Sequence, residues 1–346
     1  MIGVLGSGSW ATAVVKVLLE QPEARVCWFV REPEIRESLS THGRNFRYLP
    51  EVTIDADRLE ICTDAQTVVE RCELIYLIVP TAYLHGVLQT VDPALLRSRY
   101  LVSAIKGFVP EVDEIVTDYL QHVYHVPEEH LAIISGPTHA EEVARERLTF
   151  ITAATRNTQL GEQIRGQLRC HYMTVSISDD MRGIQFSTAL KNIYAVAAGI
   201  CNGMDSGDNL MAVLVSYALA EAQLFLNKMQ PKRNSVLTVS SLPPYVGDLL
   251  VTCYSQFSRN RTLGTMIGRG YSVQSAQLEM NMVAEGYYAA RSMEKIRKAM
   301  NVEMPIAHAV YLILFEQAKP DVILRAWQII NNREIKITDM KSGDCL

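Results

Sequence analysis

The chain opens on a short apolar run that ends in a glycine-rich turn, and this turn limits the possible folds most strongly. Residues 1–5 are followed by Gly6 and Gly8, and Ala11 lies in a helix-forming stretch that continues to residue 20. Gly6 permits the tight turn, and Gly8 lets a pyrophosphate approach the backbone beside a helix N-terminus. Ala11 takes the third glycine position, which the pattern tolerates. The turn predicts a dinucleotide-binding βαβ unit at the start of the chain.

Apolar runs alternate with helical patterns through the first half of the chain. Continuous apolar runs suit parallel strands buried on both faces, and we expect them at residues 25–30, 74–79, 100–105 and 131–134, with later strands at 149–154 and 172–175. Helical stretches are expected at 82–90, 111–122 and 140–146. The alternation predicts an α/β protein with an N-terminal Rossmann-like doubly wound sheet.

The second half of the chain changes to helical periodicity. A long Ala-, Leu- and Met-rich pattern covers 183–228, and a Ser/Pro/Gly-rich loop is expected at 234–247. Further helices are expected at 248–254, 261–267, 273–280 and 287–300, then from 305 and at 321–331. We therefore expect a dinucleotide-binding domain at residues 1–180 and an all-helical substrate-binding domain at 181–346.

Composition limits the class of protein and its location. The chain has 346 residues, 48% of them hydrophobic, and a formal net charge of −5, which argues against a nucleic-acid partner. The seven cysteines show no C-x-x-C spacing, and the histidines are scattered, so we expect reduced thiols and no metal site. No signal peptide and no apolar run of spanning length is found, which predicts a cytoplasmic protein without stable membrane insertion.

The residues after the second expected strand bear on the choice of dinucleotide. Arg31 directly follows that strand, and a guanidinium can hold the 2′-phosphate of NADP. Glu32 comes next and suits the ribose 2′-hydroxyl of NAD instead. A solvated arginine at a strand end would serve neither purpose. We favour NADP and keep NAD open.

Two lysines are candidates for the chemistry. Lys106 follows the strand expected at 100–105, at the sheet edge where α/β proteins bind ligands. Lys191 lies inside a long apolar helix, where a charge is costly to bury unless it faces a cleft or a partner. Taken alone, a helical lysine most often lies on a solvated face.

Three further segments carry polar groups that suit an anionic substrate. Asp248 and Thr252 are four residues apart and share one face of an expected helix. Residues 258–261, Ser-Arg-Asn-Arg, either bind a phosphate at a helix start or form an N-cap with a basic first turn. In the loop after the strand at 131–134, Thr138 either caps a helix or binds a ligand.

Taken together, these segments resemble the bacterial-type NAD(P)-dependent glycerol-3-phosphate dehydrogenases. The resemblance runs in order along nearly the whole chain, through Gly6-Ser-Gly8-Ser-Trp10, Tyr48-Leu-Pro50, Val79-Pro80, Lys106-Gly107, Ser135-Gly-Pro137, Ala189-Leu-Lys191-Asn192, Gly207-Asp-Asn209, Gly247-Asp248-Leu, Thr252-Cys253, Ser258-Arg259-Asn260-Arg261, Glu285-Gly286 and Met304-Pro305-Ile306. So many collinear motifs are specific to a family, whereas a shared Rossmann fold would account only for the first.

The resemblance implies an activity and a role for each residue. It implies hydride transfer between NAD(P)H and C2 of dihydroxyacetone phosphate, with Lys191 as the general acid/base and Lys106 orienting the carbonyl. The implied substrate-binding residues are Lys106, Gly136, Thr138, Lys191, Asp248, Thr252, Ser258, Arg259 and Asn260. The implied cofactor-binding residues are Gly6, Gly8, Ser9, Trp10, Arg31, Tyr48, Lys106, Ala140, Arg259, Val283 and Glu285.

The chain departs from the family pattern at three further places, and rival functions stay open. Residues 185–188, 216–218 and 243–246 differ from the usual family sequence, which puts loop geometry and regulation in doubt. One rival is a related two-domain β-hydroxyacid or ketopantoate-type dehydrogenase. Another is a non-catalytic nicotinamide-binding sensor, against which the two lysines argue. The oligomeric state, including a homodimer, is left open.

Overall fold

The structure, a computed structural model, describes residues 1–231, 242–280, 284–324 and 326. Two compact units divide the chain: Met1–Thr188 with Leu237–Asp248, and Ala189–Val236 with Leu249–Leu346. This division differs from the single boundary expected at residue 180. Helix α9 (Met181–Gly203) begins within the first unit, where Gln185 Nε2 donates to Thr117 Oγ1 over 2.7 Å. Tyr245 donates a hydrogen bond to Asp180, so a segment from later in the chain also belongs to the first unit.

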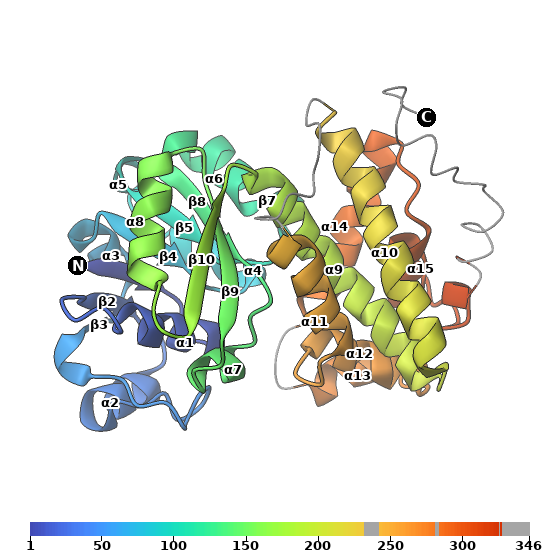
Figure 1. The fold of residues 1–346 in the computed structure, drawn as a ribbon, viewed down its shortest axis with the longest axis horizontal. Coiled ribbons are helices and arrows are strands. Elements are labelled where there is room, and N and C mark those ends of the chain that lie inside the picture. The colour runs from blue at the N-terminus through green and yellow to red at the C-terminus, as the bar shows by residue number, and fades with distance from the viewer. Residues whose placement is uncertain (232–241, 281–283, 325, 327–346) are drawn as a thin grey trace. The chain divides into compact units, whose positions relative to one another are not determined.

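An eight-stranded sheet forms the first unit (Figure 1). From one edge to the other the strands are β10 (Met173–Ser178), β9 (Thr149–Ala154), β8 (Leu131–Ser135), β5 (Tyr100–Ser103), β4 (Leu74–Leu77), β1 (Ile2–Leu5), β2 (Val26–Phe29) and β3 (Leu59–Cys62). All neighbours are parallel except β8 and β9, which run antiparallel. The expected doubly wound α/β fold is confirmed, with β9 and β10 reversed relative to the rest.

Strand β1 lies at the point where the strand order reverses. Gly3 pairs with Cys27 of β2 on one side and with Ile75 of β4 on the other. The chain moves outward through β2 and β3, then crosses back to β4 and continues the other way. In such sheets ligands bind at the carboxyl ends of the strands beside this reversal. The loops after β1 and β4 are therefore the positions to inspect.

The helices of the first unit are α1 (Ser9–Leu18), α2 (Pro33–His42), α3 (Ala65–Arg71), α4 (Thr81–Leu88), α5 (Pro93–Ser98), α6 (Val116–Tyr124), α7 (Ala140–Ala144) and α8 (Thr158–Leu168). Several of them, among them α2 and α3, were not predicted from the sequence patterns. The helix expected at 111–122 starts only at Val116. Strands β6 (Phe108–Val109) and β7 (Glu114–Ile115) form a hairpin before it, and Asp113 turns that hairpin with a φ of 56°.

The second unit is helical in the residues that the structure describes. After α9 come α10 (Gly207–Met229), α11 (Asp248–Tyr254), α12 (Arg259–Gly268), α13 (Val273–Glu279), α14 (Glu285–Met300) and α15 (Pro305–Phe315). The continuous pattern expected at 183–228 breaks between α9 and α10, where Asp205 and Gly207 both have positive φ. Part of the loop expected at 234–247 is a short π-helical turn, Pro243–Gly247. Most of the helix expected at 321–331 lies outside the described residues.

Helices α9 and α12 cross at close backbone distance because glycines face each other. A Cβ at Gly199 of α9 would lie 2.0 Å from the Arg261 carbonyl oxygen, and one at Gly264 of α12 would lie 2.1 Å from that of Val196. Only glycine leaves room for such contact between two helix backbones. The crossing fixes the start of α12 against the part of α9 that carries Lys191 and Asn192.

Among the helices that the structure describes, α10 is long and apolar enough to cross a membrane by length and composition alone. This is weak evidence, since core helices pass the same test. Its buried side chains recur at helical spacing on one face, from Met211 through Leu214 and Ala218 to Phe225. The same face includes the buried carboxylate of Glu221. The pattern is that of a helix packed on one side within a domain.

Candidate active site

The glycine turn after β1 has the shape that a dinucleotide requires. Gly6 has a φ of 126°, and a Cβ there would lie 2.2 Å from the Ile78 carbonyl oxygen at the end of β4. A Cβ at Gly8 would meet no atom within 4 Å. Gly8 is also the N-cap of α1, and no side chain caps the helix there. The turn is therefore closed against the sheet at Gly6 and open at Gly8, in front of a helix N-terminus.

Two buried side chains that sequence reasoning missed hold this turn in place. Asn45 donates from Nδ2 to the Ser7 carbonyl and to Thr12 Oγ1, both over 2.8 Å. The Trp28 indole donates to the Gly6 carbonyl. A lone asparagine in a polar loop carries no pattern by which it could have been found. Trp28 lies in the second expected strand, where nothing in the strand pattern marks a role for its indole nitrogen.

The end of β2 presents two side chains of opposite charge. The Glu32 carboxylate accepts a 2.7 Å hydrogen bond from Ser7 in the glycine turn and lies 3.2 Å from Arg31. Burial acts to raise the pKa of Glu32, but the Ser7 hydrogen bond and the Arg31 charge outweigh it and hold the pKa below its usual value. The Arg31 side chain is 71% exposed and lies over the ring of Tyr83. Arg31, which suits NADP, and Glu32, which suits NAD, therefore both lie at the end of β2, and both interpretations stay open.

The other cofactor-binding candidates of the first unit lie near the same turn. Ser9 donates to the Tyr48 carbonyl over 3.4 Å, and Ala140 is the first residue of α7. The Trp10 indole nitrogen is buried and has no hydrogen-bond partner among the described residues. An unused donor beside the open Gly8 position fits a bound pyrophosphate or ribose. Of the remaining candidates, Glu285 opens α14, and Val283 lies outside the described residues.

Lys106 is the centre of a polar cluster in the first unit. Its Nζ donates to the Gly136 carbonyl over 3.0 Å, to Thr138 Oγ1 over 3.2 Å and to Asp248 Oδ2 over 3.0 Å. The Asp248 side chain is 1% exposed and that of Lys106 is 19% exposed. His139, and not Thr138, precedes α7 as its N-cap. Three of the expected substrate residues, Gly136, Thr138 and Asp248, therefore contact the ammonium group of a fourth, Lys106. The buried Asp248 carboxylate neutralises that ammonium.

Lys191 is held in the second unit. Its Nζ donates to Thr252 Oγ1 over 2.9 Å, and both residues are almost fully buried. Burial also raises the pKa of the neighbouring Cys253 to about 12, so that thiol is neutral at physiological pH. Because Lys191 is buried, it does not lie on a solvated helix face, where a helical lysine is most often found. Thr252 lies one helical turn after Asp248 in α11, as the sequence predicted.

The start of α12 is tied to both α9 and α14. Asn260 Nδ2 donates to Asn192 Oδ1 over 2.9 Å, and Asn260 Oδ1 accepts from the Gly286 backbone over 2.8 Å. Ser258 caps the helix by accepting from the Arg261 backbone, while Arg259 is exposed. Ser258 therefore forms the expected N-cap, and the exposed Arg259 side chain stands at the same helix N-terminus, so the phosphate interpretation stays a prediction.

A Rossmann-type sheet with an open glycine turn, joined to a helical unit with a buried lysine, defines a two-domain nicotinamide-dinucleotide-dependent dehydrogenase. Comparison with protein families gives the more specific assignment. Residues 1–161 match the NAD-dependent glycerol-3-phosphate dehydrogenase N-terminus, and residues 180–325 match the C-terminus. The chain belongs to the NAD-dependent glycerol-3-phosphate dehydrogenase family.

Individual relatives agree with the family assignment. The NAD(P)+ glycerol-3-phosphate dehydrogenase of Staphylococcus haemolyticus is 33% identical over 318 residues, which are 91% of this chain and 93% of the relative. The crystal structure of a Coxiella burnetii glycerol-3-phosphate dehydrogenase superposes with a TM-score of 0.83 at 27% identity, covering 96% and 98% of the two chains. A Ralstonia eutropha ketopantoate reductase reaches a TM-score of 0.54 at 12% identity over 94% and 100%, a likeness of fold alone.

Proposed function

We propose that the protein catalyses reversible hydride transfer between NAD(P)H and C2 of dihydroxyacetone phosphate, giving sn-glycerol 3-phosphate. Family membership supports this reaction. The observation that carries it is the pair of anchored lysines, Lys106 with Asp248 and Lys191 with Thr252. Lys191 has no assigned part in dinucleotide binding, which disfavours a non-catalytic sensor. The ketopantoate-type alternative has only a shared fold behind it.

The cofactor supplies the hydride, and the side chains of this chain act on the C2 oxygen. As negative charge develops on that oxygen, Lys191 donates a proton to it from Nζ. In the oxidative direction the same amine accepts the proton. Burial of Lys191 and Thr252 excludes water from the amine, and the Thr252 hydroxyl fixes its direction. Lys191 is therefore the proposed general acid/base.

Lys106 has the complementary role of stabilising charge on the C2 oxygen. Its ammonium is already ordered by one carbonyl, one hydroxyl and one carboxylate, so little reorganisation accompanies the reaction. Asp248 neutralises the ammonium before substrate binds. Gly136 and Thr138 set its position from the loop that follows β8. Asp248, Gly136 and Thr138 are therefore positioning residues for Lys106.

The phosphate of the substrate is assigned to the start of α12. The exposed Arg259 guanidinium can form a bidentate pair with a phosphate, and the helix N-terminus adds a favourable dipole. Asn260 and Ser258 complete the proposed set. Binding energy from the phosphate is remote from the reacting carbon and can be used to position it.

For the cofactor, we favour NADP over NAD. The Arg31 guanidinium is exposed and available to a 2′-phosphate, whereas Glu32 is already hydrogen-bonded to Ser7. The proposed physiological direction is reduction, which supplies glycerol 3-phosphate for phospholipid synthesis. The proposed location is the cytoplasm. The six cysteines that the structure describes are all free thiols, which suits a reducing compartment.

A direct test compares substrates on the purified full-length protein. Oxidation of NADPH and of NADH is followed with dihydroxyacetone phosphate, ketopantoate and a β-ketoacid under steady-state conditions. The proposal predicts turnover with dihydroxyacetone phosphate and a kcat/KM at least about 100-fold higher than with either carboxylate substrate. Preferred turnover of ketopantoate would reject it in favour of the related dehydrogenase. Tight NADPH binding without turnover of any ketone would support the sensor.

A further inference from the structure

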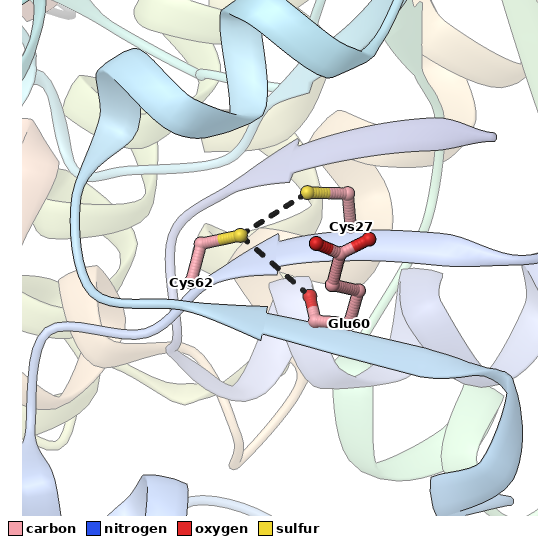
Figure 2. A group of neighbouring side chains, drawn as sticks. All are labelled: Cys27, Glu60 and Cys62. Carbon is pink, nitrogen blue, oxygen red and sulfur yellow. Dashed lines mark hydrogen bonds between the residues drawn. The ribbon is translucent and has the colours of Figure 1, made fainter.

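Away from the proposed active site, two neighbouring strands place three metal-ligating side chains on one face of the sheet (Figure 2). Strands β2 and β3 are parallel, with Cys27 opposite Glu60 and Phe29 opposite Cys62. Because side chains alternate along a strand, Cys27, Glu60 and Cys62 point to the same side. No motif in the sequence predicts this cluster, since Cys27 and Cys62 are 35 positions apart.

The ligand atoms of this cluster are already close enough for one cation. The Cys27 and Cys62 sulfurs are 3.2 Å apart, and one Glu60 carboxylate oxygen lies with them in a group whose members are all within 4.8 Å of one another. In a tetrahedral zinc site, bonds of about 2.3 Å to sulfur and 2.1 Å to oxygen place the ligand atoms roughly 3.5–3.8 Å apart. Side-chain adjustments of a few tenths of an ångström to about 1 Å would therefore suffice.

The strand register disfavours a disulfide as the alternative use of the two thiols. The cysteines are offset by two residues on adjacent parallel strands. Ideal sheet geometry then puts their Cα atoms about 8 Å apart, beyond the roughly 7 Å that a disulfide bridges without backbone movement. The thiols can converge on a cation between them more easily than they can bond directly.

The residues around the cluster balance its negative charge and leave a path by which a cation can enter. Arg71 pairs with Glu60, so two thiolates, one carboxylate, a divalent cation and one guanidinium sum to zero. Strand β3 is the edge of the sheet, and the Glu60 side chain is 35% exposed while both thiols are buried. A cation can therefore enter past Glu60 to a largely closed, sulfur-rich site.

We propose that Cys27, Cys62 and Glu60 form a binding site for a thiophilic divalent cation of the zinc class. Two thiolates with one carboxylate select zinc or cadmium over the oxygen-preferring magnesium and calcium. On binding, each thiol releases its proton to solvent and forms a sulfur–metal bond, with no change of oxidation state. The site is independent of the proposed dehydrogenase activity. A cation bound there would stabilise the end of β2 just before Arg31, because the Val30 backbone N–H donates to the Cys62 carbonyl over 3.1 Å.

The test is a cadmium titration of the reduced, chelator-treated, full-length protein, followed by sulfur-to-cadmium charge-transfer absorption. The wild type is expected to saturate at about one equivalent, and zinc is expected to abolish the band by competition. Cys27→Ser and Cys62→Ser are expected to lose the band. Cys170→Ser, which leaves the cluster intact, is expected to keep it.

Glu60→Gln is the second variant, because it keeps both thiols and changes a partly exposed side chain. It is expected to weaken cadmium binding at least about tenfold while the charge-transfer band persists at saturation. The proposal is overturned if the wild type shows no saturable band near one equivalent, or if the band survives in both cysteine variants. Unchanged cadmium affinity in Glu60→Gln also overturns the three-ligand site.

Discussion

Two buried carboxylates, one in each unit, are held in different ways. In the first unit, the buried Asp248 carboxylate is matched by the ammonium of Lys106. In the second unit, the buried Glu221 carboxylate accepts hydrogen bonds from the backbone N–H groups of Ile306 and Ala307, and Lys191 donates to a neutral hydroxyl. A charge matched by an opposite charge is stabilised in its ionised form, whereas a group held by neutral partners can change protonation at lower cost. Glu221 is therefore the buried carboxylate that we expect to change protonation near neutral pH.

The largest expected effect comes from removing the amine of the second unit. Lys191→Ala should lower kcat by about 10²–10⁴-fold, because a general acid/base contributes on that order. Steady-state assay with dihydroxyacetone phosphate and NADPH measures the loss. Lys228→Ala is the matched control, since Lys228 is an exposed lysine of the same unit that donates to the Asn301 carbonyl. A Lys191→Ala enzyme as active as the control would remove Lys191 from the chemistry.

The next effect tests the charge pair of the first unit. Asp248→Asn keeps the shape of the side chain but leaves the Lys106 ammonium without its carboxylate. We expect kcat/KM to fall by about 100-fold through misplacement of the ammonium. Asp208→Asn, on the exposed first turn of α10, is the control. If Asp248→Asn and Lys106→Met together lost as much as the sum of the single losses in free energy, the pair would not act as a unit.

The free energy of unfolding is expected to depend on pH through the buried Glu221 carboxylate. Burial raises its pKa from 4.5 to about 7, against the opposing backbone hydrogen bonds from Ile306 and Ala307. Because the folded pKa lies above the unfolded one, the contribution to stability is complete below about pH 4.5 and is lost as the pH rises to about 7. The loss is roughly 3 kcal/mol of unfolding free energy.

Urea unfolding of wild type and Glu221→Gln at about pH 5 and about pH 8 checks this prediction. The wild type should lose roughly 2.5 kcal/mol more than the variant between the two values, because part of the total is already lost at about pH 5. Glu279→Gln, at the exposed end of α13, should follow the wild type. Parallel pH dependence in wild type and Glu221→Gln would show that this carboxylate is ionised at both values.

The smallest expected effect concerns the exposed charges after β2. Arg31→Ala should weaken NADPH binding by about 1.5–3 kcal/mol and leave NADH binding nearly unchanged, because only NADPH carries the 2′-phosphate. Glu32→Gln should weaken NADH more than NADPH. Arg25→Ala, on an exposed arginine before the same strand, is the control. Equal losses of both cofactors in Arg31→Ala would contradict a role in 2′-phosphate recognition.

Local signals made much of the fold predictable. The glycine turn, the central apolar strands and the helices after Asp248 each have a periodic or positional signature within a short window. Strand β3 and helix α2 were missed because both are short and incompletely buried, so their side chains show little hydrophobic periodicity. Strand β7 of the hairpin falls within the helix predicted at 111–122, because the turn before it depends on the positive φ of Asp113.

The site was less accessible to sequence reasoning because its contacts are long-range. Lys106 and Asp248 are 142 positions apart, and Lys191 and Thr252 are 61 apart. Position and spacing marked each of these residues as a candidate and the family resemblance implied their roles, but no local pattern pairs residues so far apart. The supporting Asn45 had no family motif to mark it, and the Cys27–Cys62 cluster depends on strand register. The roles of the individual site residues remain predictions that the variants above address.

Chemical rescue tests the different roles of the two lysines most directly. Lys191→Ala and Lys106→Ala are assayed with dihydroxyacetone phosphate in the presence of primary amines of similar size and different pKa. If Lys191 transfers the proton, its rescue rate should vary with amine pKa along a Brønsted line. If Lys106 supplies charge only, its rescue should be independent of amine pKa as long as the amine is protonated. The same dependence in both variants, or a flat response for Lys191→Ala, would contradict the assignment.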